Sequence, residues 1–139
     1  MQEFLKFAND NALLVTATVL MALAVLFYEL RQRSRRVFEV SCPQAVRLIN
    51  AGAKIVDVRD SRRFEAGHII DSINIPSDQL AKDKRLPGKA KAVIVVCDRG
   101  VVSLRSVEEL RKAGFEHAYS LRGGVEAWSQ DNLPLVTGK

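Results

Sequence analysis

The stretch Ala92–Gly114 limits most strongly what this chain can fold into. It opens with a continuous apolar run, Ala92–Val96, that is rich in β-branched side chains and is typical of a strand buried on both faces of a parallel sheet. The segment that follows repeats apolar residues at helical spacing and ends at a glycine, which predicts an amphipathic helix that stops at Gly114. Cys97 is therefore predicted at the carboxyl end of a buried strand, facing a helix N-terminus.

This position favours chemistry at Cys97. The first turn of a helix has unpaired N–H groups and a positive dipole end, and Ser103 is predicted to cap it. A tight loop closing on that turn aims several amides at one point and forms an anion site. A thiol at that point is pushed toward thiolate, which is the nucleophilic form. The alternative is that Cys97 is a small hydrophobic residue that ends a strand.

The rest of the globular region, residues 38–136, predicts an α/β domain with a mainly parallel five-stranded sheet flanked by helices. The other four strands are predicted at residues 38–40, 54–58, 73–75 and 117–121. In such sheets ligands bind beyond the carboxyl ends of the strands, where Cys97, Asp57 and Arg59 are expected to meet. This convergence favours the functional interpretation of Cys97.

The N-terminal region predicts a membrane anchor. Residues 12–28 contain no charged residue, and as a helix they span ~25 Å at ~1.5 Å per residue, which is near the length a bilayer requires. We expect a short leader at 1–11, a transmembrane helix at 12–30 in the lipid bilayer, and a basic linker at 31–37. The linker holds Arg31, Arg33, Arg35 and Arg36, which by the positive-inside rule predict a single-pass topology with the N-terminus outside and the globular domain in the cytoplasm.

Two other interpretations of the apolar segment are less favoured. A cleaved signal peptide needs a more basic start than the single Lys6, and the apolar run continues past the small residues that imitate a cleavage site. A buried core helix would not be followed directly by a cluster of arginines.

Composition excludes several function classes. The net charge is +5, but basic and acidic residues alternate along the globular region, so we expect no nucleic-acid partner. Cys42 is predicted to be a passive residue at a helix boundary, His68 a structural hydrogen-bond partner in a turn and His117 exposed at a strand start. Two isolated histidines and two distant cysteines give no metal-binding spacing, and Trp128 is expected to be a core residue.

Several short motifs, in this order and spacing, resemble a rhodanese-like domain over residues 38–136. They are Asp57-Val58-Arg59, the segments 64–69 and 73–76, the cysteine loop, and Leu121-Arg122-Gly123-Gly124 followed by Ala127-Trp128. With the anchor in front, the chain resembles a bacterial inner-membrane rhodanese-like protein.

The resemblance implies sulfur transfer without a cofactor or metal. Cys97 would attack the sulfane sulfur of thiosulfate or of a persulfide donor, and the resulting Cys97 persulfide would pass that sulfur to cyanide or a thiol. Asp57 and Arg59 match an acid–base pair that would brace the loop. The substrate-binding loop would be formed by Asp98, Arg99, Gly100, Val101, Val102 and Ser103.

One departure from the family matters, because active single-domain members usually have arginine where this chain has Val102. Without that arginine an anionic donor loses a charge-assisted hydrogen bond of ~1.5–3 kcal/mol. Asp98 beside the thiol disfavours a thiolate, and Arg99 would compensate if it turned inward. An uncharged or protein-borne donor is therefore as compatible with the loop as thiosulfate.

Two alternatives remain beside the sulfurtransferase. A weak or inactive rhodanese module would act as a membrane-tethered adaptor for a membrane-protein or cytoplasmic partner. A persulfide or redox sensor would use the same cysteine without turnover. The sequence specifies neither the physiological donor and acceptor nor the oligomeric state.

Overall fold

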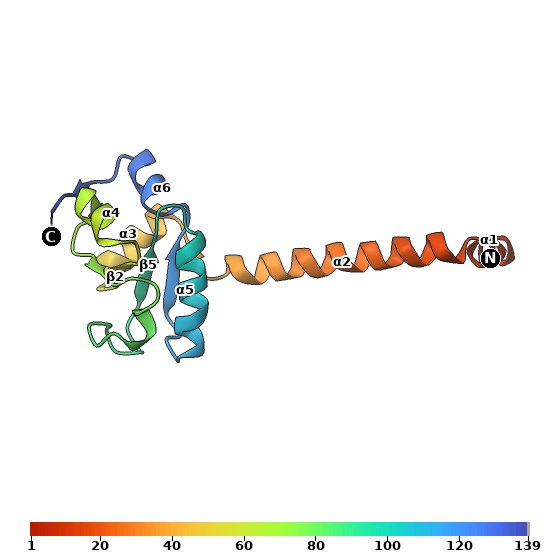
Figure 1. The fold of residues 1–139 in the computed structure, drawn as a ribbon, viewed down its shortest axis with the longest axis horizontal. Coiled ribbons are helices and arrows are strands. Elements are labelled where there is room, and N and C mark those ends of the chain that lie inside the picture. The colour runs from red at the N-terminus through yellow and green to blue at the C-terminus, as the bar shows by residue number, and fades with distance from the viewer. Residues whose placement is uncertain (139) are drawn as a thin grey trace. The chain divides into compact units, whose positions relative to one another are not determined.

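The computed structural model describes residues 1–138, except for the side chains of Phe4, Leu5, Ser34, Arg35 and Arg36. The chain divides into two compact units, and the boundary lies between Val37 and Phe38. Figure 1 shows the two units, a helical one at the N-terminus and an α/β domain after it.

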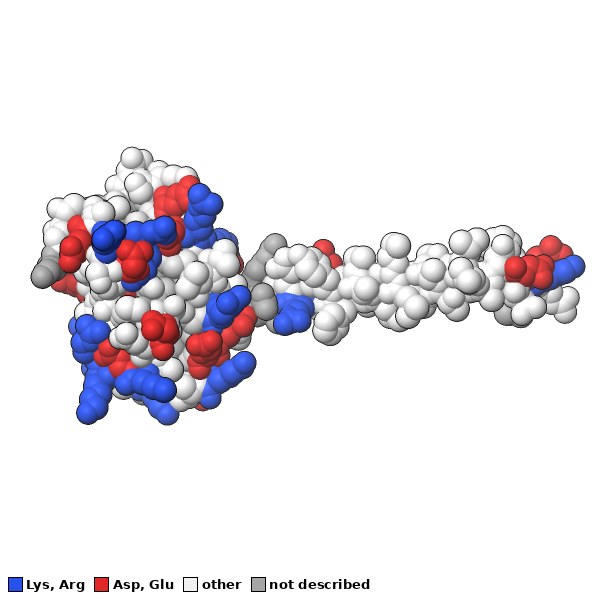
Figure 2. All heavy atoms as spheres, viewed as in Figure 1, with Lys and Arg blue, Asp and Glu red and all other residues white. Residues whose placement is uncertain are grey.

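The N-terminal unit consists of helices α1 (Gln2–Asp10) and α2 (Ala12–Arg36). The segment Ala12–Arg33 is long and apolar enough to cross a membrane, with a mean hydropathy of 2.2. Figure 2 shows an uncharged surface along the middle of α2, with charged atoms near its ends. The hydroxyl of Thr16 donates to the carbonyl of Ala12 at 2.8 Å, so this polar side chain leaves no unpaired group within the apolar segment.

Helix α2 continues through much of the basic linker predicted at 31–37. The side chains of Arg31 and Arg33 are exposed at its C-terminal end, whereas those of Arg35 and Arg36 lie outside the described residues. The leader predicted at 1–11 is largely helical, because it forms α1.

A five-stranded parallel sheet forms the centre of the second unit, in the order β1-β6-β5-β2-β4. This confirms the α/β fold and the mainly parallel five-stranded sheet predicted from the sequence. The central strand β5 is buried along its whole length, as its β-branched residues predict. The strands are β1 (Glu39–Val40), β2 (Lys54–Asp57), β4 (Ile73–Asn74), β5 (Val93–Val96) and β6 (Ala118–Leu121).

Helices cover both faces of this sheet (Figure 1). Side chains of β5 alternate between two core clusters: Ile94 and Val96 pack with Trp128, and Val93 and Val95 pack with residues of the cysteine-loop helix, such as Leu110. The helices are α3 (Cys42–Asn50), α4 (Ser61–Ala66), α5 (Val101–Lys112) and α6 (Gly124–Gln130), with a short 3₁₀ helix at Leu80–Lys82.

The predicted start of α5 is wrong. Gly100 is its N-cap, in a left-handed conformation with φ of 90°, and the helix begins at Val101. Ser103 lies inside the first turn, where its hydroxyl contacts the hydroxyl of Ser120 at 2.8 Å. A glycine adopts this conformation at little steric cost, so the chain turns into the helix before it reaches the serine. Val101 and Val102 are therefore helical residues.

A second, two-stranded sheet was not predicted. Strand β3 (His68–Ile69) pairs antiparallel with β7 (Leu135–Val136). Strands of two residues carry too little alternation of apolar and polar side chains to be recognised in a sequence. The pairing fixes the C-terminal segment beside α4 and brings Leu135 close to Gly67.

Candidate functional site

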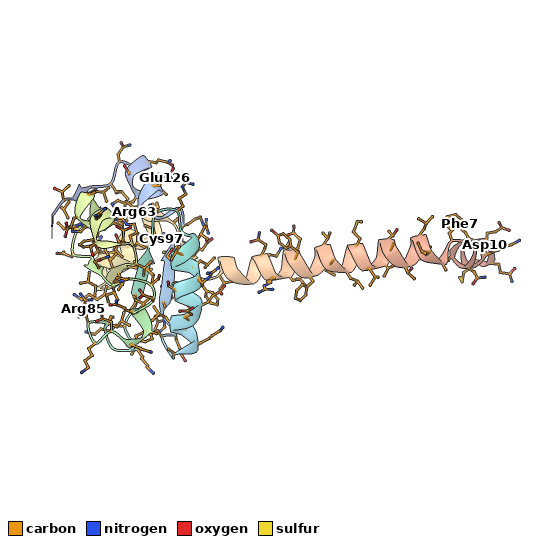
Figure 3. The ribbon with its side chains drawn as sticks, in the orientation of Figure 1. Phe7, Asp10, Arg63, Arg85, Cys97 and Glu126 are labelled. Carbon is orange, nitrogen blue, oxygen red and sulfur yellow. The ribbon has the colours of Figure 1, made fainter. Side chains whose placement is uncertain are left out.

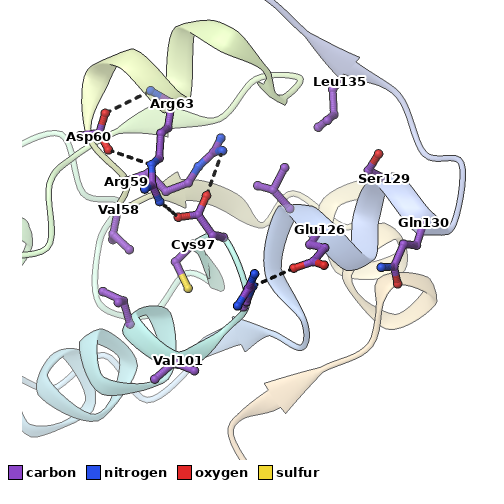
Figure 4. A pocket seen from close by; sticks show the side chains of 14 residues that line it. Val58, Arg59, Asp60, Arg63, Cys97, Val101, Glu126, Ser129, Gln130 and Leu135 are labelled. Atoms are coloured by element: carbon purple, nitrogen blue, oxygen red, sulfur yellow. Dashed lines mark hydrogen bonds and ion pairs between the residues drawn. The ribbon is translucent and has the colours of Figure 1, made fainter.

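Cys97 follows the last residue of β5 and forms part of an open hollow of about 940 Å³ (Figure 4). The residue is only 4% exposed. Its sulfur nevertheless meets backbone amides, because the N–H of Gly100 donates to Sγ at 3.0 Å and the N–H of Ser103 donates at 3.3 Å. The Cys97 thiol also contacts the Ser103 hydroxyl at 3.3 Å. The sulfur therefore lies among hydrogen-bond donors at the start of α5.

The conformation at Gly100 explains this arrangement. With φ at 90°, the loop reverses direction and points its amide back toward the sulfur. A Cβ at this position would lie 3.0 Å from the backbone nitrogen of Gly123, so the position also has little room for a side chain. The two amides and the positive end of the helix dipole together suit a negatively charged sulfur atom.

Helix α6 holds the other side of the loop. The N–H of Val125 donates to the carbonyl of Cys97 at 2.9 Å, and the N–H of Glu126 donates to the carbonyl of Asp98 at 3.1 Å. Gly124 permits this approach, since a Cβ there would lie 2.1 Å from the carbonyl oxygen of Cys97. The loop backbone is thus clamped between two helix N-termini, and its carbonyls point away from the sulfur.

Asp57 and Arg59 form a buried pair under the site. The Arg59 guanidinium donates to both carboxylate oxygens of Asp57, with its closest contact, Nη2 to Oδ2, at 2.7 Å. It also donates to the carbonyl of Gly67 at 2.7 Å, which ties β2 to the start of β3. Burial opposes the charge of Arg59, but hydrogen bonds and charge interactions with Asp57 and Asp98 outweigh it, so the pKa of Arg59 is raised above its ordinary value.

The carboxylate of Asp98 is turned toward arginines of the neighbouring segment. It forms an ion pair with Arg63 of α4, and its Oδ1 lies 3.6 Å from Nη1 of Arg59. Its negative charge beside the thiol is therefore compensated locally, which weakens the expectation that Asp98 opposes a thiolate. Arg63 was not among the residues predicted for the site, because it lies thirty-five residues before Asp98 in the sequence.

Arg99 does not turn toward the sulfur. Its side chain is 81% exposed, and its Nε lies 3.1 Å from Oε2 of Glu126. Val102, where the sequence departs from the family pattern, is half-exposed on the first turn of α5. The compensation that Arg99 would give for the missing arginine is absent from this geometry.

Comparisons with known proteins agree with the fold. Residues 41–131 match the family model described as the Rhodanese-like domain. This chain belongs to the rhodanese family. It is 36% identical over 143 residues to YibN of Escherichia coli, an uncharacterised protein, with all of both chains covered. It is 34% identical over 100 residues to the thiosulfate sulfurtransferase GlpE of Actinobacillus pleuropneumoniae, covering 71% of this chain and 93% of GlpE.

Among solved structures, this rhodanese domain is similar to a rhodanese-related protein of Thermoplasma volcanium. The TM-score is 0.64 at 28% identity, over 70% of this chain and 96% of the other.

Most of the residues predicted for the rhodanese site meet at this hollow. Cys97, Asp98, Arg99, Val101 and Val102 line it, as does Arg59. The amides of Gly100 and Ser103 donate to the Cys97 sulfur, and Asp57 is buried and accepts hydrogen bonds from Arg59. Figure 3 shows Cys97, Arg63 and Glu126 toward one end of the domain and Arg85 at the other end.

The sequence missed the residues that reach the hollow from distant segments. Glu126, Ser129 and Gln130 come from α6, and Leu135 comes from β7. The position of Leu135 depends on the pairing of β7 with β3, and that of the α6 residues on the hydrogen bonds between α6 and the Cys97 loop, so neither leaves a local signal in the sequence. Only the Gly-Gly pair before α6, read as a sharp turn, indicated that a backbone approaches closely there.

The second cysteine of this rhodanese has a different environment. Cys42 is the first residue of α3 and is also 4% exposed. Burial, together with a hydrogen bond to Asp131 and the charge of that residue, raises the pKa of the Cys42 thiol from 9.0 to about 11. It is therefore a protonated, weakly nucleophilic thiol at neutral pH. His68 stacks on Phe64 and bonds its carbonyl, which is the structural role expected for it.

Proposed function

We propose that this chain is a membrane-anchored sulfurtransferase that carries sulfane sulfur as a persulfide on Cys97 to a thiol or cyanide acceptor. The observation that supports it most directly is the position of Sγ, in contact with the amides of Gly100 and Ser103 in an open hollow. The similarity to GlpE, a protein named thiosulfate sulfurtransferase, supports the same reaction class.

The geometry accommodates a two-step transfer. In the first step the Cys97 thiolate attacks the sulfane sulfur of the donor, the donor's S–S bond breaks, and the leaving group departs with the electron pair. In the second step an acceptor thiolate attacks the outer sulfur of the Cys97 persulfide and expels the Cys97 thiolate. The amides that meet Sγ stabilise the charge on sulfur in both steps, because they are fixed by the backbone and need no rearrangement.

Helix α2 would hold the domain at a bacterial inner membrane. Its apolar segment is followed by Arg31 and Arg33, which favours a cytoplasmic domain and an outside N-terminus. Proteolysis of inverted vesicles is expected to digest the domain, whereas intact spheroplasts protect it. Protection in inverted vesicles would contradict this orientation.

The decisive experiment measures the mass of the intact protein. The detergent-solubilised full chain is incubated with thiosulfate or an organic persulfide, and one added sulfur atom is expected on the wild type and on Cys42→Ser. Cys97→Ser is expected to gain none. If no sulfane donor adds sulfur to the wild type, the proposed activity is wrong.

A catalytically inactive adaptor is the second candidate. It is favoured by the exposed valines at the mouth of the hollow, since Val101 is 75% and Val102 48% exposed. In that case a membrane-protein partner would copurify equally well with the wild type and Cys97→Ser, and the mass measurement would show no adduct.

A further inference from the structure

The charges that line the Cys97 hollow balance one another. Among the described residues, its charged lining consists of three arginines and three carboxylates: Arg59, Arg63 and Arg99, with Asp60, Asp98 and Glu126. In Figure 4, Arg59, Asp60 and Arg63 lie close together on one side of Cys97, and Glu126 lies on another side. A hollow with this lining offers no net positive charge to an anion.

Each of these arginines already has a carboxylate partner. Arg63 contacts Asp98, and its Nε lies 3.4 Å from Oδ2 of Asp60. Arg99 contacts Glu126 at 3.1 Å, and buried Arg59 contacts Asp57 at 2.7 Å. The exposed pairs are individually weak, so Arg63 and Arg99 can turn toward a ligand. Turning them leaves the carboxylates in place, however, and the balance of charge around the ligand does not change.

The amides of Gly100 and Ser103 can stabilise the negative charge on only one part of an anionic donor. They lie at Sγ of Cys97, and so face the sulfane sulfur that is being transferred. Thiosulfate carries a second region of negative charge on its sulfonate oxygens, which must lie farther out in the hollow. There it meets arginines that are already paired with Asp98 and Glu126, and apolar side chains, so the lining supplies no net counter-charge for a desolvated anion.

Apart from Cys97 and two uncharged polar residues of α6, Ser129 and Gln130, the remaining lining is apolar. Val58, Val125 and Leu135 line the hollow, and Val101 and Val102 project from the first turn of α5 with much of their surface exposed. Such side chains fit the carbon atoms next to a sulfur. The hollow of about 940 Å³ is at the upper end of the range that holds drug-sized organic ligands, ~300–1,000 Å³, and is much larger than an inorganic ion requires.

We infer that the site selects organic persulfides, R–S–S–H, whose substituent R is uncharged beside the sulfur, over thiosulfate, and that Val102 is a determinant of this selectivity. This inference rests on the proposed transfer through Cys97. The Cys97 thiolate forms a bond to the outer sulfur, and the S–S bond between the two sulfurs of the donor breaks. The outer sulfur stays on Cys97 with its hydrogen, and R–S⁻ leaves with the electron pair of the broken bond and takes up a proton from water. No oxidant or reductant is consumed.

Three donors test the inference on the full chain in detergent. They are thiosulfate and two persulfides of similar intrinsic reactivity, those of 2-mercaptoethanol and mercaptoacetate, which differ in the charge of the substituent. The rate of sulfur addition to Cys97 is followed by intact mass in single-turnover reactions. For the wild type we expect the hydroxyethyl persulfide to react fastest, and the carboxymethyl persulfide and thiosulfate to react more slowly.

Val102→Arg places a cation on the first turn of α5, and Val102→Gln is the matched uncharged control. We expect Val102→Arg to raise the efficiency with thiosulfate relative to hydroxyethyl persulfide by at least about tenfold, the value of one charge-assisted hydrogen bond. Val102→Gln is expected to change this ratio much less. Glu126→Gln, which removes the partner of Arg99, tests the same idea at a second position and is expected to raise the ratio less than Val102→Arg.

The outcomes separate the inference from the proposed function. If the wild type reacts equally well with both persulfides, or fastest with thiosulfate, the selectivity is wrong and sulfur transfer stands. If neither Val102→Arg nor Glu126→Gln raises the thiosulfate ratio, the charge balance does not determine selectivity. If none of the three donors modifies Cys97 in any variant, the proposed function itself fails.

Discussion

The two cysteines of this chain share two properties and differ in one that matters. Cys97 and Cys42 are each 4% exposed, and each lies at the N-terminal end of a helix. The sulfur of Cys97 accepts two backbone N–H groups, whereas the thiol of Cys42 interacts with the carboxylate of Asp131. Burial and a nearby helix dipole therefore do not by themselves determine the environment of a cysteine sulfur; the direction of the nearest donors and charges distinguishes these two.

The difference originates in the backbone before each helix. Ser41 precedes α3 in an extended conformation, and its capping interactions with Gln44 satisfy groups at that helix start. Gly100 precedes α5 in a left-handed conformation with no side chain to cap the helix, so the amides there are directed at the sulfur. A side-chain cap and an anion site are alternative uses of the same helix end.

The largest effect on this comparison is expected from Gly124→Ala. The added methyl group would lie 2.1 Å from the carbonyl oxygen of Cys97, so the loop or α6 must move. We expect a loss of roughly 4 kcal/mol or more in the free energy of unfolding, and loss of sulfur addition at Cys97. Urea unfolding and intact mass measure the two effects.

Gly52→Ala is the matched control, because Gly52 also has positive φ, 98°, but open space around its Cβ position. It is expected to cost only about 1–2 kcal/mol, the strain of a left-handed residue, and to keep sulfur addition. Equal destabilisation by the two substitutions would show that backbone strain, and not the clamp on the Cys97 loop, explains the effect of Gly124→Ala.

The next largest effect is expected in the rate at which an alkylating reagent modifies Cys42. With its pKa raised from 9.0 to about 11, the native thiol has roughly 100-fold less thiolate at pH 8 than an unperturbed thiol. In Cys97→Ser, which leaves one cysteine, iodoacetamide should modify Cys42 about 100-fold more slowly in the native chain than in urea. The native rate is expected to rise with pH up to about 11, because deprotonation is displaced upward.

Asp131→Asn tests the cause of this protection. It removes the charge that acts on Cys42 and leaves the burial, so the curve of alkylation rate against pH should move down but not fully to an ordinary value. If the alkylation of Cys42 in native Cys97→Ser, with Asp131 unchanged, already follows a pKa near 9, then burial and Asp131 do not raise the pKa of this thiol.

The smallest effect is expected from Ser103→Ala. This change removes the hydroxyl that contacts both Sγ and Ser120 but keeps the backbone amide that donates to the sulfur. We expect sulfur addition to slow by about two- to tenfold, which corresponds to one neutral hydrogen bond of ~0.5–1.5 kcal/mol. Ser120→Ala, which touches the sulfur only through Ser103, should slow it less. If Ser120→Ala slows sulfur addition more than Ser103→Ala does, the contact between the two hydroxyls acts mainly on the stability of the fold.

The sequence predicted those parts of the molecule that depend on local pattern. The apolar run before Cys97 predicted the buried strand, and the alternation of strands and helices predicted the parallel sheet. The start of α5 was mispredicted because Ser103 has a good capping side chain, while the conformation of Gly100 depends on the close approach of Gly123 and Leu121. That approach is a tertiary contact and leaves no periodic signal.

The charge environment of the site was harder to predict for the same reason. From the sequence, Asp98 was considered only for the effect of its charge on the neighbouring thiol. In the fold its carboxylate pairs with Arg63, which is thirty-five residues away in the sequence. The sequence left open whether Arg99 turns inward and compensates for Val102; in the fold it pairs with Glu126 of α6 and is exposed. Which charges neutralise one another depends on how α4 and α6 pack around the loop, and spacing along the chain does not contain that information.

The pairing of β7 with β3 has a practical consequence for anyone who handles this protein. Leu135 forms part of the rim of the hollow, and the amide of Gly138 donates to the carbonyl of Glu65 at 2.9 Å. A purification handle or fluorescent protein fused at the C-terminus would thus follow, within a few residues, a segment that lines this hollow. An assay of the proposed sulfur transfer on such a fusion would be sensitive to obstruction of the hollow by the added protein, so a cleavable handle or a long spacer is the appropriate design.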